Sequence, residues 1–179
     1  MLKTAKPQSY VNNQQLKYAK QLVPQGYEWR PISPEDIPAV TDLIRKNIIG
    51  NPFWRFPEGA GGVLCSDRSG KPIATAVVQG IGFEKQGTTK GLFQLTDIAV
   101  IPEERGKGIG FLTLMMLEQV IKDFPKDIMF GGCESTAADF YSKAGFHVLK
   151  QGESLPVPVL GQFLKNANSN YPCYFYKSY

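Results

Sequence analysis

The stretch that decides the fold is residues 95–110, which read LTDIAVIPEERGKGIG. Its apolar first part predicts a buried strand that stops at Pro102, and residues 108–123 predict a helix. Between strand and helix, glycines at positions 106, 108 and 110 remove Cβ atoms where the backbone must bend. We therefore expect a strand that runs through a short turn directly into a helix.

The beginning of this helix has the chemistry of a phosphate site. The first amides of a helix have no partner within it, and the positive end of the macrodipole lies behind them. Such an end binds a phosphate or pyrophosphate. Arg105 adds a permanent cation whose fork fits phosphate oxygens. We predict a diphosphate site here; the alternative is a glycine-rich turn that only starts a helix.

Two other phosphate loops do not fit the same residues. The Walker pattern requires Gly-Lys-Ser/Thr, but Lys107 is followed by Gly108 and Ile109. A dinucleotide fingerprint that starts at Gly106 requires glycine where Phe111 stands. The turn is therefore of another type.

The rest of the chain surrounds this unit with further strands and helices. We expect strands over 27–32, 63–66, 72–83, 93–101, 127–133, 146–150 and 171–179, and helices over 12–22, 33–50, 108–123 and 135–144. Ser33 is the expected N-cap of the second helix. This order predicts an α/β (α+β) fold with a single mixed, largely antiparallel sheet flanked by helices. We expect a basic N-terminal extension, residues 1–26, and one domain, residues 27–179.

The charge of the chain is unevenly distributed. The 179 residues carry a net charge of +4. Residues 1–30 hold five basic side chains and one acidic side chain, and the remainder is neutral, with 15 of each sign. A neutral body with a basic arm does not predict a nucleic-acid-binding domain, so we do not expect nucleic acid as a partner.

Other sequence features point to the cytoplasm. We expect neither a secretory signal nor a membrane span, because no apolar run is long enough for either. Three cysteines without CxxC spacing suggest reduced core thiols in a reducing compartment and no metal site.

Two blocks of sequence carry a family resemblance. Residues 100–110, VIPEERGKGIG, resemble the acetyl-CoA signature of the GCN5-related N-acetyltransferases, Arg/Gln-x-x-Gly-x-Gly/Ala after a strand that ends in valine. Residues 137–146, AADFYSKAGF, are similar to the family's later tyrosine-to-Gly-Phe stretch, and residues 30–36 to its opening. The resemblance covers about residues 27–150. It departs from the family at Glu134, where many members have an asparagine that helps to hold the cofactor.

The resemblance implies that acetyl-CoA is the co-substrate and that an amine attacks its thioester directly in a ternary complex. The pantetheine arm would pair with the backbone of Ile98, Ala99 and Val100, and the Val100 amide would stabilise the developing oxyanion. The pyrophosphate would be held by Arg105, Gly106, Lys107, Gly108, Ile109 and Gly110. Whether the acyl group is acetyl or longer stays open.

The resemblance also implies roles for side chains. Tyr141 is expected to protonate or stabilise the leaving thiolate; the alternative is a tyrosine that only packs its ring. An alkyl amine has a pKa near ~10.4, so a base must take its proton. Asp97 and Glu134 are candidate bases, with a water relay as the alternative. His147, the only histidine, is expected to be structural.

The acceptor is expected near two segments, residues 51–57 and 151–171. The aromatic side chains of Phe53, Trp54 and Phe56 either line a pocket there or pack in the core. A small molecule or a protein amine would serve as acceptor, and a homodimer is left open. Two other functions stay open: a catalytically silent acyl-CoA-binding regulatory module, and an acyltransferase that acts on aminoacyl-tRNA or another nucleic acid.

Overall fold

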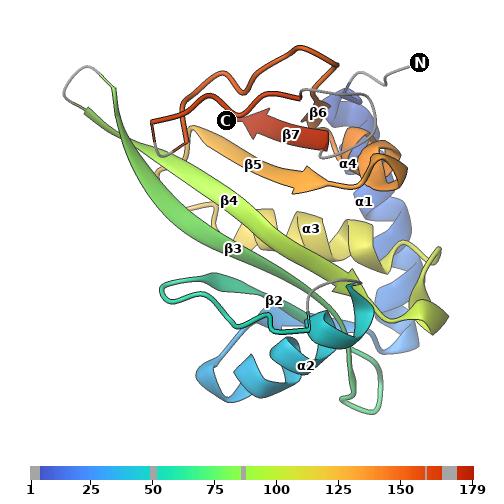
Figure 1. Ribbon diagram of the computed structural model, residues 1–179. Coiled ribbons are helices and arrows are strands. Elements are labelled where there is room, and N and C mark those ends of the chain that lie inside the picture. The colour runs from blue at the N-terminus through green and yellow to red at the C-terminus, as the bar shows by residue number, and fades with distance from the viewer. Residues whose placement is uncertain (1–4, 49–51, 86–87, 160, 167–172) are drawn as a thin grey trace. The chain divides into compact units, whose positions relative to one another are not determined.

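A computed structural model shows a seven-stranded sheet with the strand order β1-β2-β3-β4-β5-β7-β6 (Figure 1). It describes residues 5–48, 52–85, 88–159, 161–166 and 173–179. The strands are β1 (Glu28–Pro31), β2 (Gly61–Ser66), β3 (Pro72–Lys85), β4 (Thr88–Val100), β5 (Ile128–Cys133), β6 (His147–Val148) and β7 (Cys173–Ser178). The α-helices are α1 (Gln8–Leu22), α2 (Ile37–Asn47), α3 (Ile109–Val120) and α4 (Ala138–Lys143). Within the described part of the chain, no helix is both long and apolar enough to traverse a bilayer.

The predicted sheet is confirmed. Strands β4 and β5 are parallel, whereas β1 pairs with β2, β2 with β3, β5 with β7 and β6 with β7 in antiparallel fashion. The sheet is therefore single, mixed and largely antiparallel, with helices beside it. Residue contacts divide the chain into two compact units. The loop unit is Asn12–Gln79 with Leu95–Asp123, and the tyrosine unit is Met1–Val11, Gly80–Gln94 and Phe124–Tyr179.

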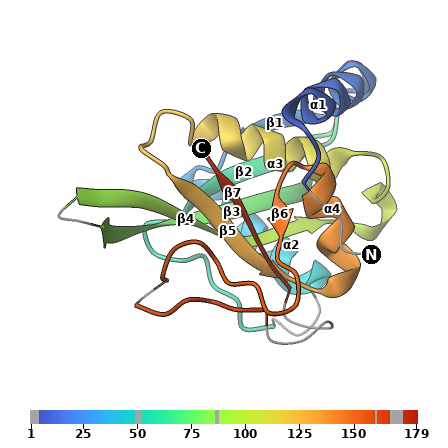
Figure 2. The ribbon, with the colours of Figure 1, turned by 90° about the horizontal axis from the view of Figure 1, so that it is seen from above.

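In the loop unit, α2 and α3 cover opposite faces of the strands (Figure 2). Side chains of consecutive strand residues point to opposite faces of a sheet, so neighbouring residues of β2 contact different helices. Leu64 packs in one cluster with Ile44 of α2, and Cys65 packs in another with Leu112 of α3. The C-terminal end of α1 joins the second cluster through Leu22, which is 1% exposed. The C-terminal end of the first helix is thus packed into this unit.

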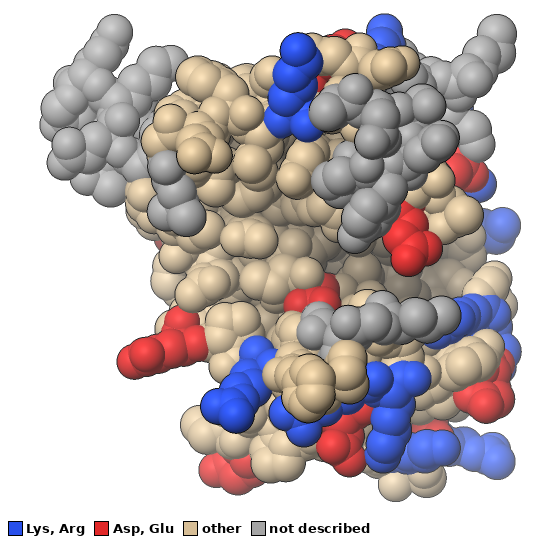
Figure 3. Space-filling model, in the orientation of Figure 1, with Lys and Arg blue, Asp and Glu red and all other residues tan. Residues whose placement is uncertain are grey.

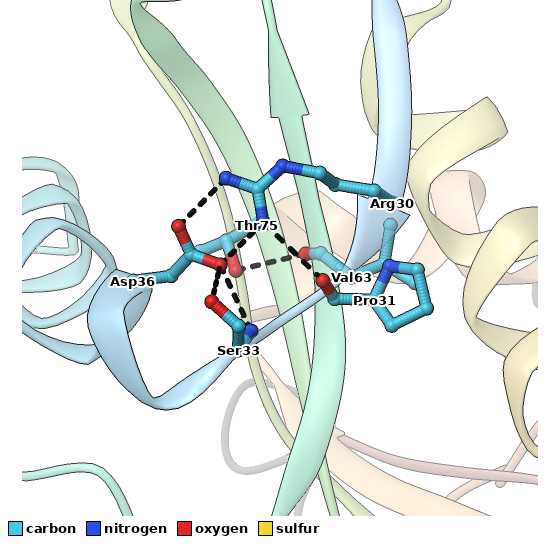
Figure 4. Close-up of polar contacts among 6 residues, drawn as sticks. All are labelled: Arg30, Pro31, Ser33, Asp36, Val63 and Thr75. Carbon is cyan, nitrogen blue, oxygen red and sulfur yellow. Dashed lines mark hydrogen bonds and ion pairs between the residues drawn. The ribbon is translucent and has the colours of Figure 1, made fainter.

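Ser33 caps the short 3-10 turn Pro34–Asp36 that leads into α2, whereas the N-cap of α2 itself is Asp36 (Figure 4). The Asp36 carboxylate accepts hydrogen bonds from the backbone N–H and the hydroxyl of Ser33, both at 2.8 Å, in a short 3-10 turn that leads into the helix. Arg30 of β1 also binds this carboxylate and holds the pKa of Asp36 well below its usual range. Beside this site, the Thr75 hydroxyl donates to the Val63 carbonyl at 3.0 Å. These contacts fix the start of α2 against the sheet.

In the tyrosine unit, β5 lies between β4 and β7. Leu92 of β4 stands opposite Ile128 of β5, and Gly131 of β5 stands opposite Phe175 of β7. The apolar cluster of this unit is formed by side chains from β4, β5 and the chain after β6: Leu92, Ile128, Phe130, Leu149, Leu155 and Val157. The segment after β6 therefore contributes to the core of the unit.

The elements differ from the prediction in several places. Helix α1 begins earlier than predicted, at Gln8, whereas α2 and α4 begin later, at Ile37 and Ala138, each after a short 3-10 turn. Strand β3 ends at Lys85, two residues beyond the predicted end at 83. Strand β4 begins at Thr88, five residues before the predicted start at 93. The predicted strand 146–150 is reduced to His147–Val148, because only these two residues pair in register with β7. The predicted connection 151–171 folds back on itself through bridges between Ser154 and Lys165 and between Val159 and Gln162. Its residues 160 and 167–171 lie outside the described part of the chain, as does Asn51 of the predicted acceptor segment.

Candidate acetyl-CoA and acceptor site

The turn between β4 and α3 has the backbone that its glycines predict (Figure 1). Gly106 and Gly108 have φ angles of +79° and +93°, in the left-handed region that disfavours other residues. Gly108 caps α3 without a side-chain hydrogen bond, and its carbonyl accepts the first helical bond, from Leu112. The amides of residues 109–111 therefore have no partner within the helix. The geometry is that of an anion-binding helix end.

Hydrogen bonds hold this turn in place. The Tyr27 hydroxyl donates to the Glu104 carboxylate at 2.8 Å, and the Lys107 ammonium binds the same carboxylate at 2.9 Å. The bond to Glu104 raises the pKa of Tyr27, and burial adds to this effect. The hydrogen bond between Lys107 and Glu104 also raises the pKa of Lys107, and the Glu104 carboxylate compensates the charge of this lysine. These three side chains link the turn to the residue that immediately precedes β1.

Arg105 binds main-chain oxygens rather than carboxylates. Its Nε donates to the Val100 carbonyl at 3.0 Å, and its Nη2 donates to the Asn47 carbonyl at 3.3 Å. Both acceptors are neutral, and among the described residues no carboxylate forms an ion pair with this exposed side chain. Its positive charge is therefore oriented without being neutralised.

Helix α1 packs directly against the turn. A Cβ atom at Gly108 would lie 2.2 Å from Cδ1 of Tyr18, and the Tyr18 ring also packs against Phe111, 5.6 Å between centroids. Position 108 thus requires glycine for its φ angle and for the ring that covers it. Sequence reasoning did not find this contact, since the only signal of α1 was a weak helical pattern.

Asp97 lies on β4, three residues before the strand ends, and its carboxylate is largely buried. Oδ2 accepts a hydrogen bond from the indole N–H of Trp54 at 2.6 Å. Burial raises the pKa of Asp97 to about 6, although the bonds from Trp54 and the neighbouring Thr96 oppose the rise. Such a carboxylate is ionised at neutral pH, yet it is a stronger base than an exposed one.

The aromatic residues of the predicted acceptor segment do not behave alike. Phe53 is 88% exposed, whereas Trp54 is 7% exposed and packs in the cluster beside α2. Phe56 is half-buried and meets the Trp54 ring edge-on, with centroids 6.1 Å apart. Only Trp54 combines core packing with a polar contact to a predicted site residue.

Tyr141 is packed in an aromatic cluster of the tyrosine unit. Its ring stacks on Phe175 at 3.7 Å between centroids and meets Phe140 and Phe146 edge-on. The side chain is 5% exposed. The ring of Tyr141 is therefore packed among three phenylalanine rings, and the catalytic role of its hydroxyl stays a prediction.

The remaining predicted residues are distributed over both units. Ile98, Ala99 and Val100 form the end of β4 in the loop unit, together with Asp97 and residues 105–110. Glu134 is exposed and follows β5 in the tyrosine unit, where Tyr141 also lies.

Side chains expected to have no catalytic role take part in ordinary contacts. Nε2 of His147 lies 3.1 Å from a Glu153 carboxylate oxygen. The three cysteines are free, and burial raises the pKa of Cys65 and of Cys133 to about 12. In the described ranges, no three His, Cys, Asp or Glu side chains are grouped as a metal site. Two surface pockets of about 580 and 360 Å³ are lined by none of the predicted site residues.

A sequence profile of the acetyltransferase (GNAT) family matches residues 25–146. The match covers more than half of the chain, so the chain belongs to this family. It includes the β4–α3 turn, Asp97 and Tyr141, and it leaves out helix α1. No curated protein matches the sequence at a significant level.

Solved structures share the fold at low identity. The ribosomal-protein-S18-alanine N-acetyltransferase from Escherichia coli has a TM-score of 0.56 and 15% identity, over 84% of this chain and 90% of that chain. NAA60 from Arabidopsis thaliana, solved with a bisubstrate analogue, has a TM-score of 0.59 and 13% identity, over 84% and 96%. The glucosamine N-acetyltransferase region of a fungal multi-domain β-N-acetylglucosaminidase has a TM-score of 0.56 and 18% identity, over 72% of this chain. This chain spans 18% of the length of the fungal protein.

Proposed function

We propose that the protein transfers an acetyl group from acetyl-CoA to a primary amine, by direct attack in a ternary complex. The observation that carries the proposal is the β4–α3 turn, where two left-handed glycines, helix amides without a partner inside the helix and an uncompensated Arg105 meet. This arrangement suits the pyrophosphate of coenzyme A. Membership of the acetyltransferase family supports the same reaction.

The chain's residues divide the chemistry between them. The end of β4, residues 98–100, would pair with the pantetheine arm. The Val100 amide would stabilise the oxyanion. Asp97, whose pKa lies between those of ordinary carboxylates and amines, would take the proton of the acceptor, and Tyr141 would give one to the departing thiolate. Glu134 is kept as the second candidate base. The free cysteines suit a reducing, cytoplasmic setting.

The test is acetyl-CoA turnover over a panel of small amines, amino-acid derivatives and peptide N-termini. Product should be measured as free coenzyme A by chromatography rather than with a thiol reagent, because the protein has three free cysteines of its own. Saturable binding with coenzyme A release for one class of amine is expected. Binding without release over the whole panel would instead favour a regulatory module, and no binding would refute the proposal.

Replacing Arg105 with alanine should weaken acetyl-CoA affinity about tenfold, because a charge-assisted contact to the pyrophosphate is lost. The measurement is calorimetric titration with acetyl-CoA. Lys46→Ala is the matched control, since Lys46 is an exposed cation on α2 of the same unit and is not assigned to the acetyl-CoA site. Equal affinity in the wild type and Arg105→Ala would refute the assignment of the loop.

Replacing Tyr141 with phenylalanine should lower turnover about 10²-fold while acetyl-CoA affinity stays nearly constant. The ring stacked on Phe175 is retained, so the variant should still fold cooperatively. Steady-state kinetics and urea unfolding measure the two effects. Tyr174→Phe, on β7 of the same unit, serves as the control. An unchanged rate would leave Tyr141 with a packing role only.

A further inference from the structure

The Trp54–Asp97 hydrogen bond joins two residues that lie far apart in the chain. The indole N–H is a donor without acceptor capacity, so it stabilises negative charge on the oxygen that it faces. At 2.6 Å from Oδ2, it is placed to form a charge-assisted bond with the carboxylate. The contact therefore favours the ionised state of Asp97 and fixes the direction of its carboxylate.

Trp54 is itself held from two sides. Nε of Arg45 on α2 donates to the Trp54 carbonyl at 2.8 Å. The indole packs with Leu43 and Ile44 of the same helix and meets Phe56 edge-on. Because the backbone and the ring are both fixed, the donor is in place before any substrate binds.

Among the described residues of the loop unit, no basic side chain forms an ion pair with Asp97 or lowers its pKa. The pKa of Asp97 responds to burial first and then to hydrogen bonds from Trp54 and Thr96. The charged side chains on the elements packed around it are exposed: Asp42, Arg45 and Lys46 of α2, Arg55 and Glu58 of the segment that follows, and Arg105 of the turn. A buried carboxylate without a cation is costly, and an ammonium group on the acceptor would supply that cation.

We propose that Trp54 is a positioning residue for acetyl transfer, whose indole N–H orients the Asp97 carboxylate toward a cationic acceptor amine. The inference rests on the proposed function, in which Asp97 acts on the acceptor. It assigns a role to Trp54, for which the sequence allowed either pocket lining or core packing. It also defines the acceptor as an amine that arrives protonated.

The first experiment needs no substrate. The chain has two tryptophans, so a ¹⁵N-labelled sample gives two indole N–H signals. One should titrate near pH 6, vanish in Trp54→Phe and lose its titration in Asp97→Asn. The other, from Trp29, is an internal control because its N–H donates to the Thr113 hydroxyl at 3.0 Å, which does not titrate. Two signals that do not titrate would overturn the proposal, even if Trp54→Phe fails to fold.

The second experiment measures the reaction. Trp54→Phe should lower kcat about tenfold and shift the acid limb of the pH–rate profile to higher pH, because a bond to the charged form is lost. KM for acetyl-CoA should stay the same. Trp29→Phe should leave the profile unchanged. Superimposable profiles for Trp54→Phe and the wild type would overturn the positioning role. A wild-type protein without activity would refute the proposed function, while the indole titration would still decide whether Trp54 holds Asp97.

Discussion

Replacing Asp97 with asparagine should lower turnover by about 10²–10⁴-fold, the usual effect of removing a general base. The asparagine carbonyl can still accept the indole bond of Trp54, so the geometry of the site is retained. What is lost is the ability to take a proton and to attract an ammonium group. Steady-state kinetics from pH 5 to pH 9 measure the effect. The wild-type rate should fall as the pH drops through about 6, when the carboxylate becomes protonated.

The same substitution should stabilise the protein at neutral pH. Because burial raises the pKa of Asp97, the folded state binds its proton more tightly than the unfolded state does. Ionisation of Asp97 therefore lowers the free energy of unfolding, and the full decrease is reached only above about pH 6, where the folded protein has lost this proton. After allowance for solvent screening, Asp97→Asn should gain ~1–2 kcal/mol at pH 8.

Urea unfolding at two pH values tests whether Asp97→Asn raises or lowers the free energy of unfolding. The advantage of Asp97→Asn over the wild type should shrink as the pH falls from 8 to 4, where the wild-type carboxyl is protonated as well. Asp67→Asn is the control, because hydrogen bonds with Ser69 lower the pKa of this exposed carboxyl. A less stable Asp97→Asn protein at pH 8, or a difference independent of pH, would contradict the assigned pKa.

Gly91→Ala should be the most damaging substitution for stability, with a loss of ~3–5 kcal/mol or failure to fold. A Cβ atom at this position of β4 would lie 1.9 Å from the Pro125 carbonyl oxygen and 2.8 Å from Cα of Lys126. These are backbone atoms that cannot move independently. Asp127 also binds Gly91 twice, from its amide at 2.8 Å and through its carboxylate at 3.0 Å.

Gly80→Ala is the matched control for that substitution. It also lies in a long strand, β3, but its Cβ would meet only the Phe93 ring at 3.5 Å, an ordinary contact. Chemical unfolding of both variants gives the comparison, with a change below ~1 kcal/mol expected for Gly80→Ala. Similar losses for both would show that the close approach at Gly91 relaxes without cost.

The part of the fold that follows local rules was predictable from the sequence. Pro102 and the glycines at 106 and 108 mark the end of a strand and the start of a helix, and the structure has both. The cap formed by Ser33 and Asp36 is also set by neighbouring residues. Strand ends were less predictable, because pairing partners decide them: β6 keeps only the two residues that β7 pairs.

For the candidate site, the sequence supplied residue types as hypotheses, and it did not supply their contacts. A carboxylate on the strand before the loop was a reasonable base from its position alone. Its hydrogen-bond partner Trp54 is 43 residues away, and no local pattern distinguishes it from Phe53, which is almost fully exposed. The contact of the Tyr18 ring with Gly108 could not be predicted for the same reason, because the two residues are far apart in the chain. Contacts of this kind depend on tertiary packing, which the spacing of residues along the chain does not encode.

The bonds that tie Tyr27, Glu104 and Lys107 together have a thermodynamic consequence for ligand capture. A loop that is disordered before binding must lose conformational entropy when the ligand arrives, and affinity falls accordingly. Here that entropy is already lost when the polypeptide folds. Association at this turn should therefore resemble rigid docking, with little rearrangement of the main chain.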